Sequence, residues 1–177
     1  MTVETPILSR DAGHCAQTPS RRMAYALAVF TALAAHAAMP PAASAADAFD
    51  SLRGSWAGGG SVTFSGGESE KLRCTARYSG GGSSLALNVK CASASAQINL
   101  SGSLDARGNK VSGDWNESSY GISGDANGSV SGGSVRLKIS GGASGYLTLN
   151  VSGSHHSIAL STQGVAITGV NVSLNRR

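Results

Sequence analysis

The chain has 177 residues, about one domain, and 41% of them are hydrophobic, which is enough for a globular core. Charged residues make up only 14% and aromatic residues only 5%, whereas 24 residues are glycine, about double the usual share. Because glycine disfavours a helix by about 1 kcal/mol per position relative to alanine, this composition excludes a coiled coil or a long-helix protein. The sequence also lacks a stretch of about 20 apolar residues, which excludes an ordinary transmembrane helix.

The first 45 residues have the organisation of an export signal. The arginine pair at residues 21–22 precedes an apolar run over residues 24–38, and two prolines end that run. The A-x-A motif over residues 43–45 then predicts cleavage between Ala45 and Ala46. We therefore divide the chain into a signal peptide over residues 1–45, a flexible N-terminal segment over 46–53 and a folded domain over 54–177.

Two features of this signal stay open. The chain starts at Met1 or at Met23, and the arginine pair leaves both the general and the twin-arginine export routes open. By either route we expect a periplasmic or secreted protein that does not span a membrane after processing. Residues 46–177 keep 11 Lys and Arg against 8 Asp and Glu, without a basic cluster interleaved with aromatic residues. Nucleic acid is therefore not an expected partner.

Short segments of alternating apolar and polar residues follow residue 54, separated by Gly and Ser clusters. Such turn signals every ~8–12 residues are typical of an antiparallel sandwich or barrel. The pattern predicts an all-β, up-and-down meander of about 8–10 strands, with no useful helix after residue 46. The expected strands cover residues 55–64, 69–79, 84–93, 96–104, 110–117, 120–130, 134–140, 145–153, 155–161 and 164–175.

We favour closure of these strands into a small barrel over two packed sheets or a glycine-rich solenoid. Closure removes the sheet edges, which so weakly charged a chain protects poorly, and small inward residues let a narrow barrel close. The expected small inward positions are Gly58, Gly60, Gly113, Gly124, Ala126 and Gly128. In the last strand, a bulge near Gly169 would absorb a one-residue shift of the apolar pattern.

One hairpin can be placed in register from the sequence alone. A turn centred near residues 81–82 sets Cys74 opposite Cys91 and Tyr78 opposite Leu87 on the apolar face. An even pair of cysteines in an exported chain is typical of a disulfide. We predict that Cys74 and Cys91 form a disulfide.

Catalytic and metal-binding patterns are weak. Adjacent residues on a strand point to opposite faces, so His155 and His156 cannot both ligate one metal, and we expect them exposed at a hairpin turn. For the same reason Asp114 and Glu117 do not form an acid pair. We expect no enzyme, no metal and no cofactor. The large rings of Trp56, Trp115 and Tyr78 either stack on a ligand or plug the barrel.

The motif Gly54-Ser55-Trp56 at the first expected strand resembles the G-x-W that opens lipocalin and avidin-like barrels. In those families the Trp plugs one end of the barrel against a late Arg, which implies that role for Arg176 or Arg177 here. In outline the chain is also similar to serralysin-type metalloprotease inhibitors, which are exported small barrels with G-x-W and one disulfide. That likeness implies that residues 46–50 enter a protease cleft.

A third resemblance covers most of residues 52–175. It is to small exported proteins of rhizobia and related alphaproteobacteria, a family that carries no established activity. The matching segments are residues 54–60, 70–78, 87–93, 111–117, 121–124 and 161–174. The sequence thus predicts a non-enzymatic binding or envelope-associated barrel, with a periplasmic protease inhibitor as the alternative. A small apolar ligand, a glycan and a protein all stay open as partners.

Overall fold

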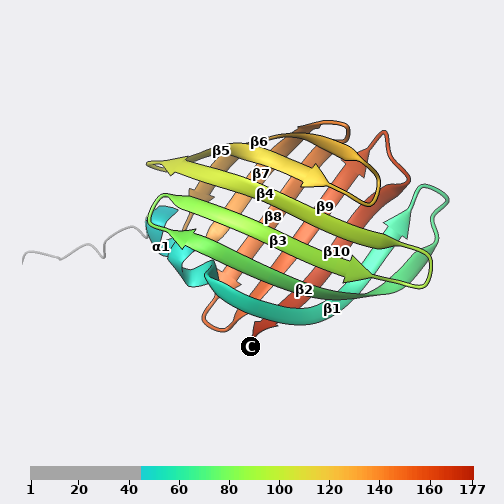
Figure 1. The fold of residues 1–177 in the computed structure, drawn as a ribbon, viewed down its shortest axis with the longest axis horizontal. Helices are drawn as coiled ribbons and strands as arrows, with labels where there is room; N and C mark the ends of the chain where they lie inside the picture. Colours follow the sequence, from blue (N-terminus) through green and yellow to red (C-terminus); the bar gives the residue numbers. More distant parts are fainter. Residues whose placement is uncertain (1–44) are drawn as a thin grey trace, which may run out of the picture. The chain divides into compact units, whose positions relative to one another are not determined.

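The computed structural model describes residues 45–177, which form one helix and ten antiparallel strands closed into a barrel (Figure 1). The elements are α1 Ala45–Leu52, β1 Gly54–Phe64, β2 Ser69–Gly81, β3 Ser84–Ala92, β4 Gln97–Arg107, β5 Lys110–Glu117, β6 Ile122–Ser131, β7 Ser134–Gly141, β8 Ser144–Ser152, β9 His155–Gln163 and β10 Ile167–Arg176. The expected antiparallel meander and its closure into a barrel are confirmed.

Pairing of the first and last strands closes the barrel. Each strand pairs with its neighbours in the sequence, and β1 pairs with β10 from Trp56 opposite Arg176 onward. The register then shifts, because Thr63 pairs with Gly169 but the next residue of β1 pairs with Ile167. The extra residue in β10 is the bulge expected near Gly169.

The registered hairpin between β2 and β3 is confirmed. Cys74 lies opposite Cys91 and Tyr78 opposite Leu87. The two cysteines form a disulfide with their Cα atoms 4.1 Å apart, and both face the barrel interior. The disulfide therefore ties together two adjacent strands of the wall, as the spacing predicts.

Glycines in the strands mark places where neighbouring backbones crowd together. At Gly60 a Cβ atom would lie 1.8 Å from the carbonyl oxygen of Asn171 on β10, far inside van der Waals contact. Gly124 has an equally close carbonyl on β7. Glycine is therefore needed at these expected inward positions because the neighbouring backbone leaves no room for a Cβ atom, more than because the barrel interior is narrow.

We expect Gly60→Ala to lower the free energy of unfolding by about 2 kcal/mol or more, because β1 or β10 must move to admit the methyl group. Urea denaturation measures the effect. The matched control is Gly169→Ala on β10, where the nearest atom to the new methyl group lies 3.7 Å away. Equal losses in the two variants would show that crowding at Gly60 is not the cause.

The helix α1 corrects the expectation that no helix follows residue 46. It lies across one end of the barrel, where Ala48, Phe49 and Leu52 are buried. The Asp50 carboxylate accepts a hydrogen bond from the Gly82 amide in the β2–β3 turn, at 3.3 Å. Eight residues are too few for a stable isolated helix, so α1 depends on this packing. From Ala48 onward, the segment expected to be flexible is packed on the barrel.

Residues 1–44 lie outside the described part of the chain, so the signal peptide and its cleavage site stay predictions. Over residues 45–177, no helix is long and apolar enough to cross a membrane.

Candidate functional site

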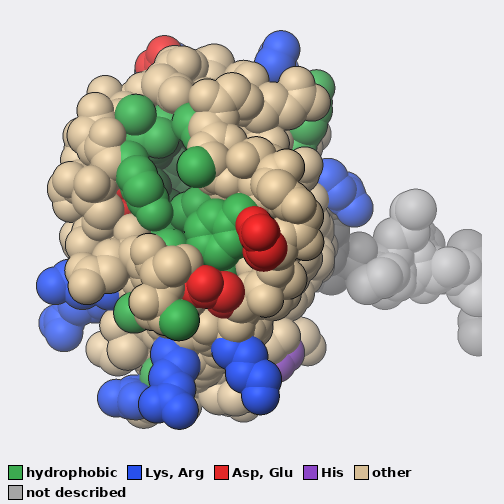
Figure 2. Space-filling model, turned by 90° about the vertical axis from the view of Figure 1, so that its right-hand side faces the viewer, with side chains coloured by type: hydrophobic (Ala, Val, Ile, Leu, Met, Phe, Trp, Pro, Cys, Tyr) green, Lys and Arg blue, Asp and Glu red, His purple; other side chains and the backbone are tan. Residues whose placement is uncertain are grey.

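The barrel encloses an apolar cavity of about 300 Å³. Every strand except β1 contributes to its lining, and Phe49 and Leu52 of α1 form its floor. Residues of the β5–β6, β7–β8 and β9–β10 turns, including Tyr120, Ala143 and Val165, line the opposite end. Seen from the side opposite α1, the barrel has a hollow with hydrophobic walls (Figure 2). The cavity therefore has a floor at α1 and a mouth at the other end.

The middle of the cavity is lined by aliphatic side chains that do not fill it. Leu87, Leu147 and Leu160 point inward from three different strands and are only partly buried. The diameter of a barrel grows with the number of strands, and the interior of a barrel of about eight strands is just wide enough for side chains to fill it. Ten strands with mid-sized side chains leave space for a ligand.

The mouth carries a buried carboxylate, that of Glu117 at the end of β5. It accepts hydrogen bonds from the backbone amides of Asn99 (2.6 Å), Ser119 (3.2 Å) and Tyr120 (2.7 Å). These bonds hold the β5–β6 turn. Asp114 points outward and accepts a hydrogen bond from the Ser103 hydroxyl at 2.7 Å, so the two acids do not form a pair. The described residues that line the cavity include no Lys, Arg or His.

Two of the aromatic residues singled out in the sequence line the cavity. Trp115 is half-buried in the wall, and its indole Nε1–H donates a hydrogen bond to the Asp125 carbonyl at 3.2 Å. Tyr78 is buried, and its hydroxyl has no hydrogen-bond partner among the described residues. Burial raises the pKa of Tyr78 well above its usual value, so the phenol stays protonated. Stacking of a ligand on these rings stays a prediction.

Trp56 does not line the cavity but packs at the closed end of the barrel, where it is 1% exposed. Its Nε1–H donates to the Leu52 carbonyl at 2.6 Å, which joins β1 to α1. The Arg176 guanidinium lies over the Trp56 ring at 4.3 Å and donates to the Ser51 and Arg53 carbonyls. This is the Trp–Arg arrangement that the G-x-W resemblance implies, with Arg176 rather than Arg177 in that role.

His156 corrects the expectation that both histidines are exposed. His155 is exposed and lies 3.1 Å from the Asn175 side-chain oxygen, but His156 is fully buried. Its ring lies edge-on to Trp56, with centroids 4.6 Å apart, and to Tyr78 at 5.5 Å. The sequence held a signal for this, because alternation along β9 gives residue 156 the same inward parity as the apolar residues 158 and 160.

Both ring nitrogens of His156 lack hydrogen-bond partners within residues 45–177. Burial, followed by the charges of His155 and Arg176, lowers the pKa of His156 from 6.5 to about 4. His156 is therefore neutral at pH 7. Over the same residues, no group of three His, Cys, Asp or Glu side chains is placed to hold a metal ion.

Comparison by structure finds barrels of the same fold. Rv2717c from M. tuberculosis is similar with a TM-score of 0.57 and 18% identity, over 77% of this chain and 99% of that one. The S-type phycobiliprotein lyase CPES from Guillardia theta is similar with a TM-score of 0.54 and 14% identity, over 76% and 93%. No family model matches the sequence, and no curated protein matches it. The likenesses show the fold alone, so the resemblance to exported proteins of rhizobia stays a prediction.

Proposed function

We propose that this protein is a non-enzymatic carrier that holds an apolar small molecule inside the barrel. The observation that carries the proposal is the cavity of about 300 Å³, which has aliphatic walls and a closed floor. Ligand sites of small-molecule-binding proteins measure about 300–1,000 Å³ and combine apolar walls with few polar groups. The structural neighbour from Guillardia theta is described as an S-type phycobiliprotein lyase, and its likeness to this chain concerns the fold alone.

The charge at the mouth favours a neutral or cationic ligand. Glu117 brings a negative charge to the mouth, and no basic side chain of the described residues lines the cavity to pair with an anion. An anionic group inside would have to give up its hydration without compensation, which is costly in an apolar site. We therefore infer selection against anionic ligands such as free fatty acids.

A pair of fluorescent probes with the same rings tests this function. Neutral N-phenyl-naphthylamine should bind at least about tenfold more tightly than anilinonaphthalene sulfonate, because only the second adds an anion to the ring system. Leu160→Trp, which fills the middle of the cavity, should weaken binding of the neutral probe by at least about tenfold. The matched control is Ala159→Trp, which adds the same ring to the exposed outer side of β9. Unchanged binding in Leu160→Trp would refute a ligand in the cavity.

Export to the periplasm or the medium is part of the same proposal. The Cys74–Cys91 disulfide supports it, because disulfides persist in oxidising compartments. The alternative, a protease inhibitor acting through the segment before Trp56, finds less support. Phe49 and Leu52 of that segment are buried against the barrel and would have to leave it to reach a protease.

A further inference from the structure

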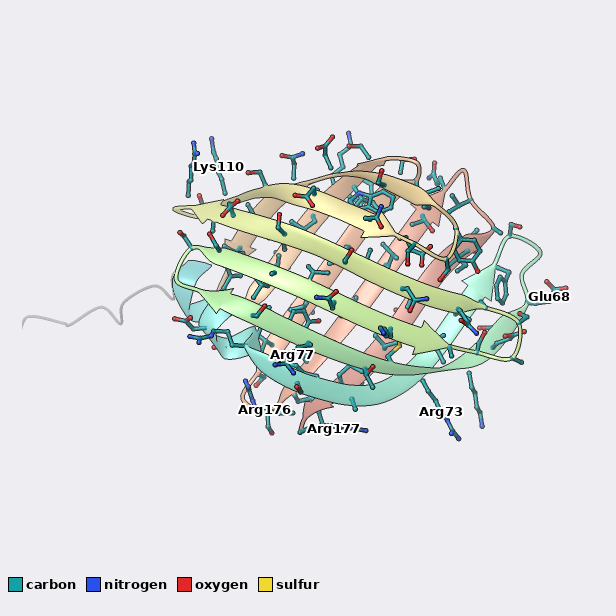
Figure 3. All side chains as sticks on the ribbon, in the orientation of Figure 1. Glu68, Arg73, Arg77, Lys110, Arg176 and Arg177 are labelled. Carbon is teal, nitrogen blue, oxygen red and sulfur yellow. A yellow bond between two sulfur atoms is a disulfide. The ribbon has the colours of Figure 1, made fainter. Side chains whose placement is uncertain are left out.

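A second site lies on the outside of the barrel, away from the cavity. Outward-facing side chains of Arg73 on β2, Lys90 on β3 and Arg177 after β10 surround a shallow depression, together with the amides of Gln97, Asn99 and Asn175. We call these six residues the basic groove. In Figure 3, Arg73, Arg77 and Arg177 project from the same side of the barrel. The groove does not depend on the proposed carrier function.

The strand register explains why these side chains meet. Across the sheet, Asn175, Ala57, Thr75, Lys90 and Asn99 lie opposite one another in a single row. A second row holds Ser173, Gly59, Arg73, Ala92 and Gln97. The small residues Ala57, Thr75 and Ala92 of these rows line the depression, together with the long side chains of the groove. Only the pairing of β1 with β10 brings the C-terminal residues to this place.

None of the cations of the groove forms an ion pair within residues 45–177. The one ion pair within residues 45–177 joins Arg53 to Asp50 at the end of the barrel. On β1, β2, β3 and β10 the one acidic residue of the described structure is Glu70, whose carboxylate accepts hydrogen bonds from the amide and the hydroxyl of Ser95 in the β3–β4 turn. Lys71 and Arg77 add two cations to β2. Arg73 and Lys90 are diagonal cross-strand neighbours, about 7–8 Å apart at their Cα atoms, where like charges repel. An anion held between them would relieve that repulsion.

We propose that the basic groove binds a linear anionic oligosaccharide of the uronate type. Guanidinium and ammonium groups pair with carboxylates. Ser119 engages the amide nitrogen of Asn99 and His155 engages the amide oxygen of Asn175, so the Gln97 amide and the other amide atom of each asparagine offer donors and acceptors to sugar hydroxyls. An anionic bilayer is a less suitable partner, because a flat membrane surface cannot enter a depression and the groove has no exposed apolar side chain that could insert into the bilayer. Tyr120 and Tyr146, the large hydrophobic residues that are exposed, both lie elsewhere. A carrier held on an acidic glycan would stay close to the cell surface or matrix.

Titration with hexagalacturonate tests the groove, with its fully methyl-esterified form as the neutral ligand of equal length. We expect binding at low salt that weakens as salt is added, and at least about tenfold weaker binding of the ester. Arg73→Gln with Lys90→Gln should weaken binding by at least about tenfold. Arg136→Gln with Lys138→Gln removes the same charge from the outer side of β7 and should change the affinity by less than about twofold.

Two results would overturn the proposal. The first is no binding of hexagalacturonate by the unmodified protein at low salt; if phosphatidylglycerol vesicles then bind, and Arg73→Gln with Lys90→Gln abolishes that binding, the groove recognises a membrane surface instead. The second is an equal loss in the two double variants, which would mean diffuse attraction by net charge. Gln97→Ala adds a test of the amides, because it keeps every charge and should still weaken binding. Each of these titrations can be run with the cavity variant Leu160→Trp, which should bind hexagalacturonate as the unmodified protein does.

Discussion

Replacing Trp56 with alanine should lower the free energy of unfolding by about 3–5 kcal/mol, the largest loss that we expect from a single substitution in this protein. Trp56 is 1% exposed and fills the closed end between β1, α1 and His156. Its removal leaves a cavity, breaks the hydrogen bond to Leu52 and takes away the ring under Arg176. Urea denaturation at neutral pH measures the loss.

Trp56→Phe separates the packing of Trp56 from its hydrogen bond. Phenylalanine keeps most of the buried ring but leaves the Leu52 carbonyl without its donor, which should cost about 1 kcal/mol. If Trp56→Ala lowers the free energy of unfolding by less than about 1 kcal/mol, Trp56 does not hold the closed end of the barrel together, because the surrounding residues then relax to fill its place. Because α1 rests on Trp56, the alanine variant should also lose the cavity floor and bind N-phenyl-naphthylamine more weakly.

The strands and their register could be predicted because the relevant signal is local. Alternation with a period of two fixes which side chains face inward, and Gly-Ser clusters mark the turns. These two signals were enough to predict all ten strands, the bulge near Gly169 and the disulfide between Cys74 and Cys91. The helix α1 could not be predicted in the same way, since so short a helix is stabilised by the barrel end and not by its own sequence.

The two candidate sites depend on closure of the barrel, which no local pattern reveals. Ten strands enclose an empty space only if the summed volume of the inward side chains is smaller than the interior volume that the barrel's width provides. The cations of β2 and β3 could be assigned to a polar face, but Arg177 joins them only because β10 pairs with β1. His156 is an intermediate case. The alternation along β9 predicts that its side chain points inward, but no local pattern predicts that its ring nitrogens lack hydrogen-bond partners.

Acidification from pH 6.5 to pH 4 should destabilise the protein through His156. Because burial and nearby positive charge lower its pKa to about 4 in the folded state, the unfolded chain binds the proton first as the pH falls through this window. The contribution of His156 is therefore fully present above pH 6.5 and falls by about 3 kcal/mol on the way to pH 4. Urea denaturation across this range measures it.

His156→Leu isolates this contribution from that of the carboxylates, because leucine fills a similar space and cannot bind a proton. At pH 7 this variant should be at least as stable as the unmodified protein, since both imidazole nitrogens are buried without partners. Between pH 6.5 and pH 4, the free energy of unfolding of this variant should fall by about 3 kcal/mol less than that of the unmodified protein. His155→Gln, which changes the exposed neighbour, should keep most of the original pH dependence. If His156→Leu and the unmodified protein lose stability in parallel, the folded barrel does not lower the pKa of His156, and water reaches the ring at the closed end.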